Sequence, residues 1–162
     1  MNEIGLSVKN IGDFVGATGI ASLLSTIILV PIVAKLKRDF PIMIIIQLLS
    51  AVIIFFVFRT NEIIIALYTL FMAYVILKAV YTPLEQHYIS SHAPAGKYGT
   101  LMGIRQSFFS IGLVLGPLIG GVLYNIKPLY VFDFSALTFV IGVVLLLIVG
   151  NRIKRVNGQI KE

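Results

Sequence analysis

Residues 106–126 read QSFFSIGLVLGPLIGGVLYNI, a run of 21 residues without a charged side chain. A helix needs about 20 mostly apolar residues to cross the hydrocarbon core of a bilayer. Valine, isoleucine and phenylalanine would also suit β-strands, but this run is too long and does not alternate as the strands of a membrane barrel do. The stretch therefore predicts a membrane-spanning α-helix.

Similar apolar runs flank this one on both sides. Together the runs predict spans at about residues 14–34, 41–58, 62–84, 104–125 and 129–149. The composition agrees, because 58% of the 162 residues are hydrophobic and only 12% are charged, against about 25% charged in soluble domains. Helices satisfy their own backbone hydrogen bonds in lipid. We therefore expect an all-α, polytopic transmembrane helix bundle of about five spanning helices.

The charged and turn-forming residues fall between these runs. The only long connection, residues 85–103, contains Pro94, Gly96 and Gly99 and predicts a surface loop. Residues 150–162 follow the last run and predict a polar, basic tail.

The basic residues orient the predicted bundle. Nine of the 13 lysines and arginines lie at one end: Lys35, Lys37, Arg38, Lys97, Arg105, Arg152, Lys154, Arg155 and Lys161. Only Lys9, Arg59 and Lys127 lie at the other end. Positive residues favour the cytoplasmic side. We expect a multi-pass protein of the cell membrane, with an outside N-terminus and residues 150–162 as a cytoplasmic tail.

Enzymatic chemistry lacks support in the sequence. There is no cysteine, which excludes disulfides and thiol catalysis. His87 and His92 are five residues apart in a connection, a poor spacing for two metal ligands on one helix face. Gly96-Lys97 lacks the remaining residues of a phosphate-binding loop. We predict no enzyme, no catalytic residue, no metal site, no cofactor and no nucleic-acid binding.

The fourth predicted span carries a distinctive pattern of small residues. Gly112, Gly116 and Gly120 are four residues apart and share one helix face, beside Pro117 and Gly121. Small residues at this spacing allow helices in lipid to approach closely, and a proline inside a helix removes a backbone hydrogen bond and bends it. The pattern predicts a helix-packing face or a hinge.

A polar stripe marks the third predicted span. Tyr74, Lys78, Tyr81 and Glu85 follow spacings of four, three and four residues, which place them on one helix face. Ionisable residues inside a membrane are candidates for a substrate or proton pathway. Two other interpretations stay open: Lys78 extends to the nearby membrane interface, and Glu85 is either a solvated end residue or the partner of Lys78.

These patterns together resemble a known family. Residues 96–103 (GKYGTLMG), then 105–107 (RQS), then the Gly-Pro pattern of residues 112–121 are similar to the major facilitator superfamily. The resemblance is strongest to its drug:proton antiporters, whose signature reads GxxxGPxxGG. It implies helices 8–12 of such a transporter, and therefore a partial C-terminal half that lacks the preceding helices.

The resemblance also implies a function. Such a transporter exports hydrophobic or cationic drugs by alternating access, coupled to protons, and this chain is then incomplete and inactive alone. Its partners would be the lipid bilayer, a small hydrophobic or cationic substrate, protons, and missing N-terminal helices or a partner chain. Two alternatives stay open: a transporter of the same superfamily for sugars, peptides or metabolites, and a small stand-alone membrane protein that acts by helix association.

Overall fold

The computed structural model describes residues 8–36, 38–60 and 63–159, and it contains no strand within them. Its elements are α1 (Val8–Lys35), α2 (Asp39–Val57), α3 (Ile63–Ala66), the π-helical turn η2 (Leu67–Phe71), α4 (Met72–Ser91), α5 (Tyr98–Ile126) and α6 (Pro128–Gln159). Five helices in this part of the chain are long and apolar enough to cross a membrane. The predicted all-α bundle of about five spanning helices is confirmed.

The third span is longer than the predicted 62–84. The segments α3, η2 and α4 follow one another without a break to Ser91, and α5 begins at Tyr98. Most of the predicted loop 85–103 is therefore helical. The physical reason is that loss of hydropathy marks the end of the apolar surface, whereas a helix continues as long as its backbone bonds are satisfied. The remaining turn contains Gly96, whose φ of 77° suits a residue without a Cβ atom.

The last helix also extends past its predicted end. It continues to Gln159, so residues 150–159 of the predicted basic tail prolong α6. Residue 62, at the start of the predicted third span, lies outside the described residues, as do Lys37 and residues 160–162.

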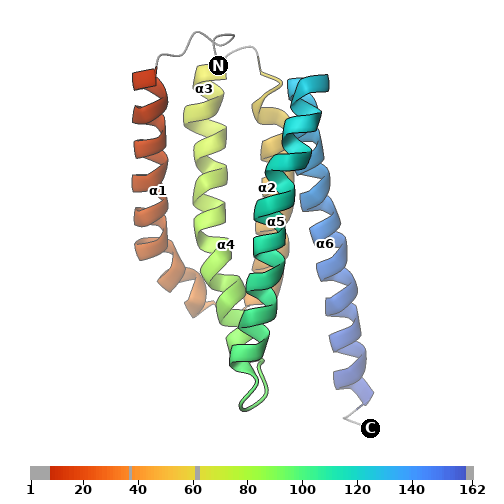
Figure 1. Cartoon of the computed structure of the whole chain (residues 1–162). Coiled ribbons are helices and arrows are strands. Elements are labelled where there is room, and N and C mark those ends of the chain that lie inside the picture. The colour runs from red at the N-terminus through yellow and green to blue at the C-terminus, as the bar shows by residue number, and fades with distance from the viewer. Residues whose placement is uncertain (1–7, 37, 61–62, 160–162) are drawn as a thin grey trace.

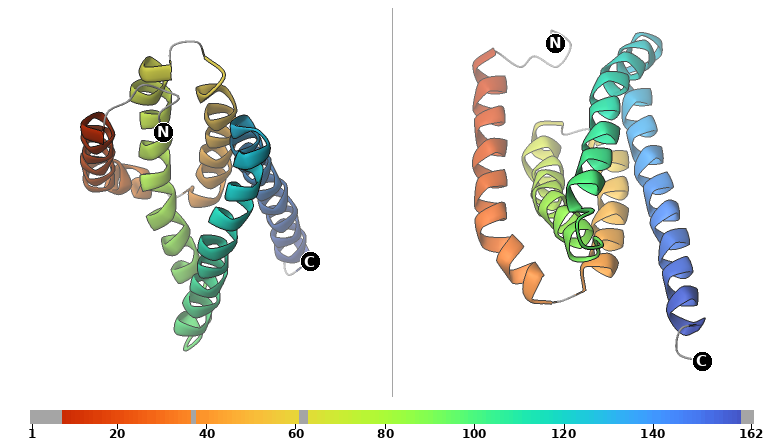
Figure 2. Two further views of the ribbon diagram at one scale, coloured as in Figure 1. Left: turned by 45° about the horizontal axis from the view of Figure 1, so that its top comes forward. Right: turned by 60° about the horizontal axis from the view of Figure 1, so that its bottom comes forward.

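The core lies around α2. This helix has the highest hydropathy of the five, and it packs against both α4 and α6. Its buried side chains are Met43, Ile46, Ser50, Ala51, Ile54 and Val57. The helix α1 packs against α4, and α5 packs against α6 and more lightly against α4. Figures 1 and 2 show α1 and α6 at opposite edges of the bundle, with α5 leaning across α2 in Figure 1.

Because successive long helices run in opposite directions, the connections between them lie at the two ends of the bundle. The ends of α1 and α4 and the start of α5 lie together at the bottom of Figure 1, whereas the α5–α6 connection lies at the top. Lys35 and Lys97 thus belong to one end and Lys127 to the other. The bundle is that of a multi-pass membrane protein, and its orientation in the membrane stays a prediction.

Candidate functional site

A cavity of about 670 Å³ lies between α2, the η2–α4 run, α5 and α6. Its polar lining comes from Gln47, Tyr74, Lys78, Ser135 and Thr138. We call it the central cavity, because two of its polar residues lie near the middle of their helices: Gln47 is the ninth of the 19 residues of α2, and Lys78 is the twelfth of the 25 residues of the span Leu67–Ser91. It brings together helices that are far apart in the sequence.

The central cavity unites parts of the two predicted functional faces. Tyr74 and Lys78 of the polar stripe line it from α4, and Gly112, Gly116 and Gly120 line it from α5. Tyr74 is held there by a ring contact with Phe139 of α6, with 5.9 Å between ring centroids. Two patterns recognised separately along the chain therefore face a common space.

Lys78 lies close to the middle of its helix. It is 11 residues after Leu67 and 13 before Ser91, which is about 17 Å and 20 Å at a rise of 1.5 Å per residue. The extension of α4 to Ser91 thus places Lys78 far from either end of the span. Within the described residues, its ammonium group forms no ion pair and its side chain no hydrogen bond.

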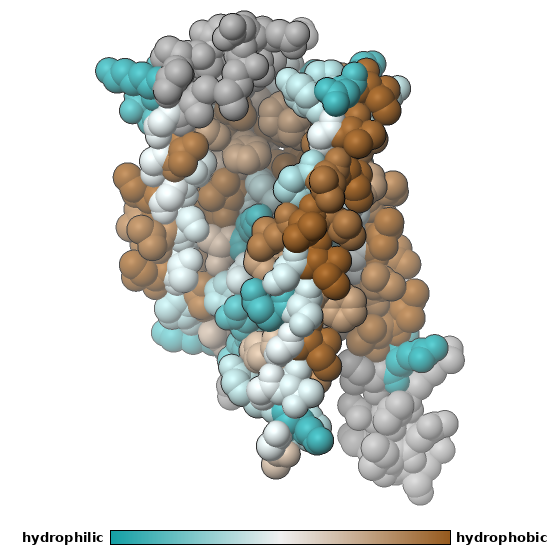
Figure 3. Space-filling view, in the orientation of Figure 1, coloured by the Kyte–Doolittle hydropathy of each residue, from teal (hydrophilic) through white to brown (hydrophobic). Residues whose placement is uncertain are grey.

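A second cavity, of about 660 Å³, lies on the other side of Lys78, between α1 and α4. Thr18, Ser22 and Thr26 line it from α1 at a spacing of four residues. In Figure 3, α1 and α5 carry pale strips on the sides that flank the space between them, and brown hydrophobic side chains on their outer sides. Lys78 therefore lies between two cavities.

The glycine face of α5 borders open space in this chain. A Cβ atom added at Gly112 or Gly116 would meet nothing within 4 Å, and one at Gly120 would only touch Val131 at 4.0 Å. No helix of the described chain approaches Gly112 and Gly116 closely. The use of Gly112, Gly116, Pro117, Gly120 and Gly121 as a packing face or hinge stays a prediction.

The other half of the polar stripe lies elsewhere. Tyr81 packs against the core cluster formed by Met43, Ile46, Val80 and Leu84. Glu85 accepts a hydrogen bond of 2.8 Å from Arg105 of α5. Their side chains are only 27% and 14% exposed, respectively. Arg105, not Lys78, is therefore the partner of Glu85, and the pair ties α4 to α5.

Two more polar side-chain contacts join helices near the ends of the bundle. At one end, Asp39 Oδ2 lies 2.8 Å from Nδ1 of His87, which links α2 to α4. At the other end, Arg59 donates a 2.6 Å hydrogen bond to Asp133, which links the turn after α2 to α6. Asp133 is the sixth residue of α6 and lies past its first turn. Nothing along the chain identified its partner, because the two residues are 74 positions apart.

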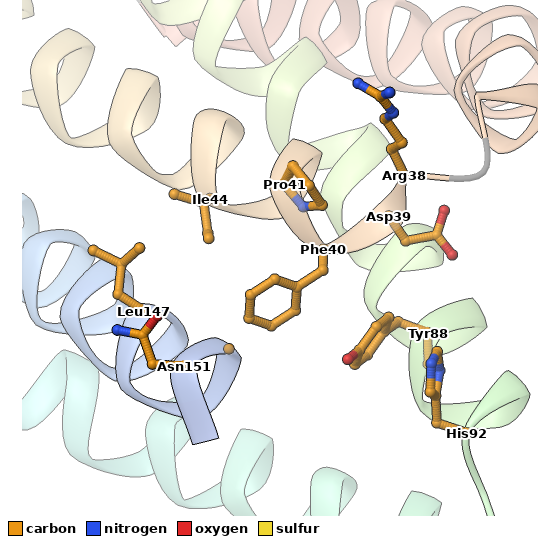
Figure 4. A pocket seen from close by; sticks show the side chains of 10 residues that line it. Arg38, Asp39, Phe40, Pro41, Ile44, Tyr88, His92, Leu147 and Asn151 are labelled. Atoms are coloured by element: carbon orange, nitrogen blue, oxygen red, sulfur yellow. The ribbon is translucent and has the colours of Figure 1, made fainter. Parts of the chain in front are cut away.

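A third cavity, of about 510 Å³, lies at the Asp39 end of the bundle. In Figure 4, Phe40 of α2 lies between Tyr88 of α4 and Leu147 of α6. The Phe40 and Tyr88 ring centroids are 5.6 Å apart. Among the residues that the structure describes, no three His, Asp or Glu side chains group closely enough to hold a metal ion.

The glycines that permit close helix contact are on α6. A Cβ atom at Gly150 would lie 2.5 Å from Cε1 of Phe40, and one at Gly142 would lie 2.5 Å from Nε2 of Gln47. These residues are eight positions apart, so they share a helix face. The spacing of these two glycines was a sign in the sequence of close helix contact on α6, but the denser glycine pattern of α5 led the prediction to α5 instead.

We expect Gly150→Ala to destabilise the protein by about 1–3 kcal/mol, because the new methyl group must displace the bulky Phe40 ring. The matched control is Gly121→Ala, where the Cβ atom would meet nothing within 4 Å. Both changes gain the same helix propensity, so their difference isolates the contact. Denaturant unfolding in mixed micelles, followed by circular dichroism, measures it. Equal stabilities would contradict the close contact at Gly150.

Comparison with known sequences places this chain in a family. The sequence model of the Major Facilitator Superfamily matches residues 1–161. The chain therefore belongs to the major facilitator superfamily, a family of membrane transporters. No solved structure matches it.

Three relatives match parts of the chain. An uncharacterized MFS-type transporter of Bacillus subtilis, YhjO, is 28% identical over 102 residues, which are 63% of this chain and 25% of that protein. An uncharacterized MFS-type transporter of Methanocaldococcus jannaschii is 41% identical over 63 residues, 36% of this chain and 16% of that protein. Multidrug resistance protein 1 of Bacillus subtilis is 40% identical over 63 residues, 39% of this chain and 16% of that protein. The chain thus spans a quarter or less of the relatives it matches.

Proposed function

We propose that this chain forms one wall of the substrate path in a proton-coupled exporter of hydrophobic compounds. The observation that carries the proposal is the central cavity, where Lys78 and Tyr74 of α4 meet the glycine face of α5. Transporters of this superfamily bind substrate near the middle of the membrane, where their helical repeats meet. A cavity midway along the helices suits that use.

The lining of the cavity favours hydrophobic substrates over sugars. Phe71, Phe132, Phe134 and Phe139 supply aromatic surface, and about 670 Å³ falls within the usual range of small-molecule sites. A sugar needs many free hydrogen-bonding groups, but the hydroxyl groups of Ser135 and Thr138 donate to carbonyl groups of their own helix. The name of one relative, Multidrug resistance protein 1, agrees with this choice.

Export by alternating access needs an opposing half. In the superfamily, two six-helix halves rock against each other around a central site. We infer that this chain corresponds to helices 8–12, with its C-terminal end in the cytoplasm, and that it does not transport alone. Glu85 and Arg105 are our candidates for proton coupling, because protonation of Glu85 would weaken the tie between α4 and α5.

The test uses Nile red, a neutral hydrophobic dye. Cells that express the complete reading frame containing these 162 codons should retain less dye than control cells, and a protonophore should abolish the difference. The 162-residue chain alone should leave dye retention unchanged. Gly112→Leu, which fills the central cavity, should restore full retention, whereas Leu113→Ile outside the cavity should not. Unchanged retention with the complete reading frame, at confirmed expression, would overturn the proposal.

A further inference from the structure

The charge of the central cavity points to a class of substrate. We propose that Lys78 makes this cavity select acidic, negatively charged amphiphilic compounds over cationic ones of the same shape. The inference rests on the proposed function, because it takes the central cavity as the place where substrate binds. It departs from the expected range of hydrophobic or cationic compounds, because it favours anionic ligands over cationic ones.

Among the residues that the structure describes, Lys78 is the only charged one in the lining of either cavity beside it. No carboxylate faces it in the described part of the chain. The acid on the same helix stripe, Glu85, is bound to Arg105 at 2.8 Å. As far as the described residues go, the cavity therefore carries one uncompensated positive charge.

The remaining described acids lie elsewhere or have partners of their own. Asp39 pairs with His87 and Asp133 pairs with Arg59, each near an end of the bundle. Asp13 lies in the second turn of α1, 65 residues before Lys78 in the sequence, and it is not part of either cavity lining. None of these carboxylates is placed to neutralise Lys78.

An unpaired ammonium group inside a membrane bundle is unfavourable, because little water is present to solvate it. A ligand anion restores the missing interaction, and it does so in a setting where charges act more strongly than in water. A ligand cation instead adds repulsion between like charges. Aromatic faces attract cations, but here they would have to overcome the full charge of Lys78.

The shape of the lining defines the rest of the ligand. The rings of Phe71, Tyr74 and Phe139 form an aromatic wall beside Lys78. The amide of Gln47 offers a further hydrogen-bond donor to the same space. A ligand with an aromatic or alkyl body and one carboxylate or sulfonate group would satisfy both parts of the cavity.

Two probes of nearly equal shape and opposite charge test the inference. Tetraphenylborate and tetraphenylphosphonium both carry four phenyl groups around a central atom. Their binding is measured by equilibrium dialysis against the full-length protein in nanodiscs of zwitterionic lipid, with the uptake by empty nanodiscs subtracted. We expect the borate to bind at least about tenfold more tightly than the phosphonium, because the charge of Lys78 attracts the anion and repels the cation.

Three variants test whether the charge of Lys78 causes the preference for the borate. Lys78→Gln should reduce the preference to less than about twofold, and Lys78→Arg should keep it, because the charge remains. Lys127→Gln, which removes a positive charge at the far end of α5, should also keep it. The arginine variant preserves the test if the glutamine variant fails to fold.

The outcomes separate this inference from the proposed function. If both probes bind but the phosphonium binds as tightly as the borate, or if Lys78→Gln keeps the preference, the inference is wrong and the substrate cavity stands. If neither probe binds beyond empty nanodiscs, the inference is wrong, and Nile red export by itself decides the proposed function. If the borate preference is found but the complete reading frame exports no Nile red, the proposed export is wrong and the charge selectivity of the cavity stands.

Discussion

Exchanging the charges of Glu85 and Arg105 should restore a protein that either single reversal destabilises strongly. Glu85→Arg places two guanidinium groups against each other, and Arg105→Glu does the same with two carboxylates. Both side chains are largely enclosed, at 27% and 14% exposed. Removing one partner of a buried ion pair costs about 3–5 kcal/mol, and we expect each reversal to reach the lower part of that range. The double variant should recover most of the loss.

The same exchange at Arg59 and Asp133 is the matched control. That pair also joins two helices, but its side chains are 34% and 36% exposed. Pairs that reach solvent contribute about 0–1 kcal/mol, so its single reversals should be mild. Unfolding free energies from titration with a denaturing detergent give both double-mutant cycles. A coupling energy for Glu85–Arg105 no larger than that of Arg59–Asp133 would contradict the enclosed tie between α4 and α5.

The second large effect concerns which side of α6 faces lipid. Leu137→Asp should impair membrane insertion of α6 by about 3 kcal/mol, because an aspartate near the centre of a span replaces a favourable leucine. Leu137 is 55% exposed and does not line the central cavity. Thr138→Asp, one residue further along the chain, should cost much less, because Thr138 and Lys78 line the same cavity.

Insertion is measured by the fraction of molecules in which an engineered glycosylation acceptor after α6 is modified in microsomes. The two variants place the same aspartate at nearly the same depth. Because one replaces a leucine and the other a threonine, each is compared with the alanine variant at its own position, and the remaining difference reports the face of the helix. Equal insertion of the two variants would show that the central cavity does not offer a polar surface at Thr138.

The spans were predictable because membrane insertion depends on local composition. Residues 106–126 are long and apolar enough to cross a bilayer whatever lies beside them, and the structure places them in α5. The same reasoning ended the third span at residue 84 instead of Ser91. Polar residues such as Glu85 stop the hydropathy signal, but they do not stop the helix.

The candidate site was predictable only in part. The spacing of Tyr74 and Lys78 placed them on one face, and the structure puts both in the central cavity. Spacing could not reveal that Tyr81 joins the core or that Glu85 binds Arg105. The sequence also contained a single amide within an apolar run, Gln47, and two hydroxyl residues in the last span, Ser135 and Thr138. It could not show that these three residues line one cavity.

The sequence by itself determined the class of the protein and the number of spans, because both depend on short stretches of chain. Only the tertiary structure decided which faces meet: the open space beside Gly112, the close contact of Gly150 with Phe40, and the isolation of Lys78. The reason is that lipid is as apolar as the side chains, so helices in a membrane do not associate by burying a hydrophobic stripe. The sequence of a helix such as α5, which is apolar on most of its surface, therefore gives little information about which helices pack beside it.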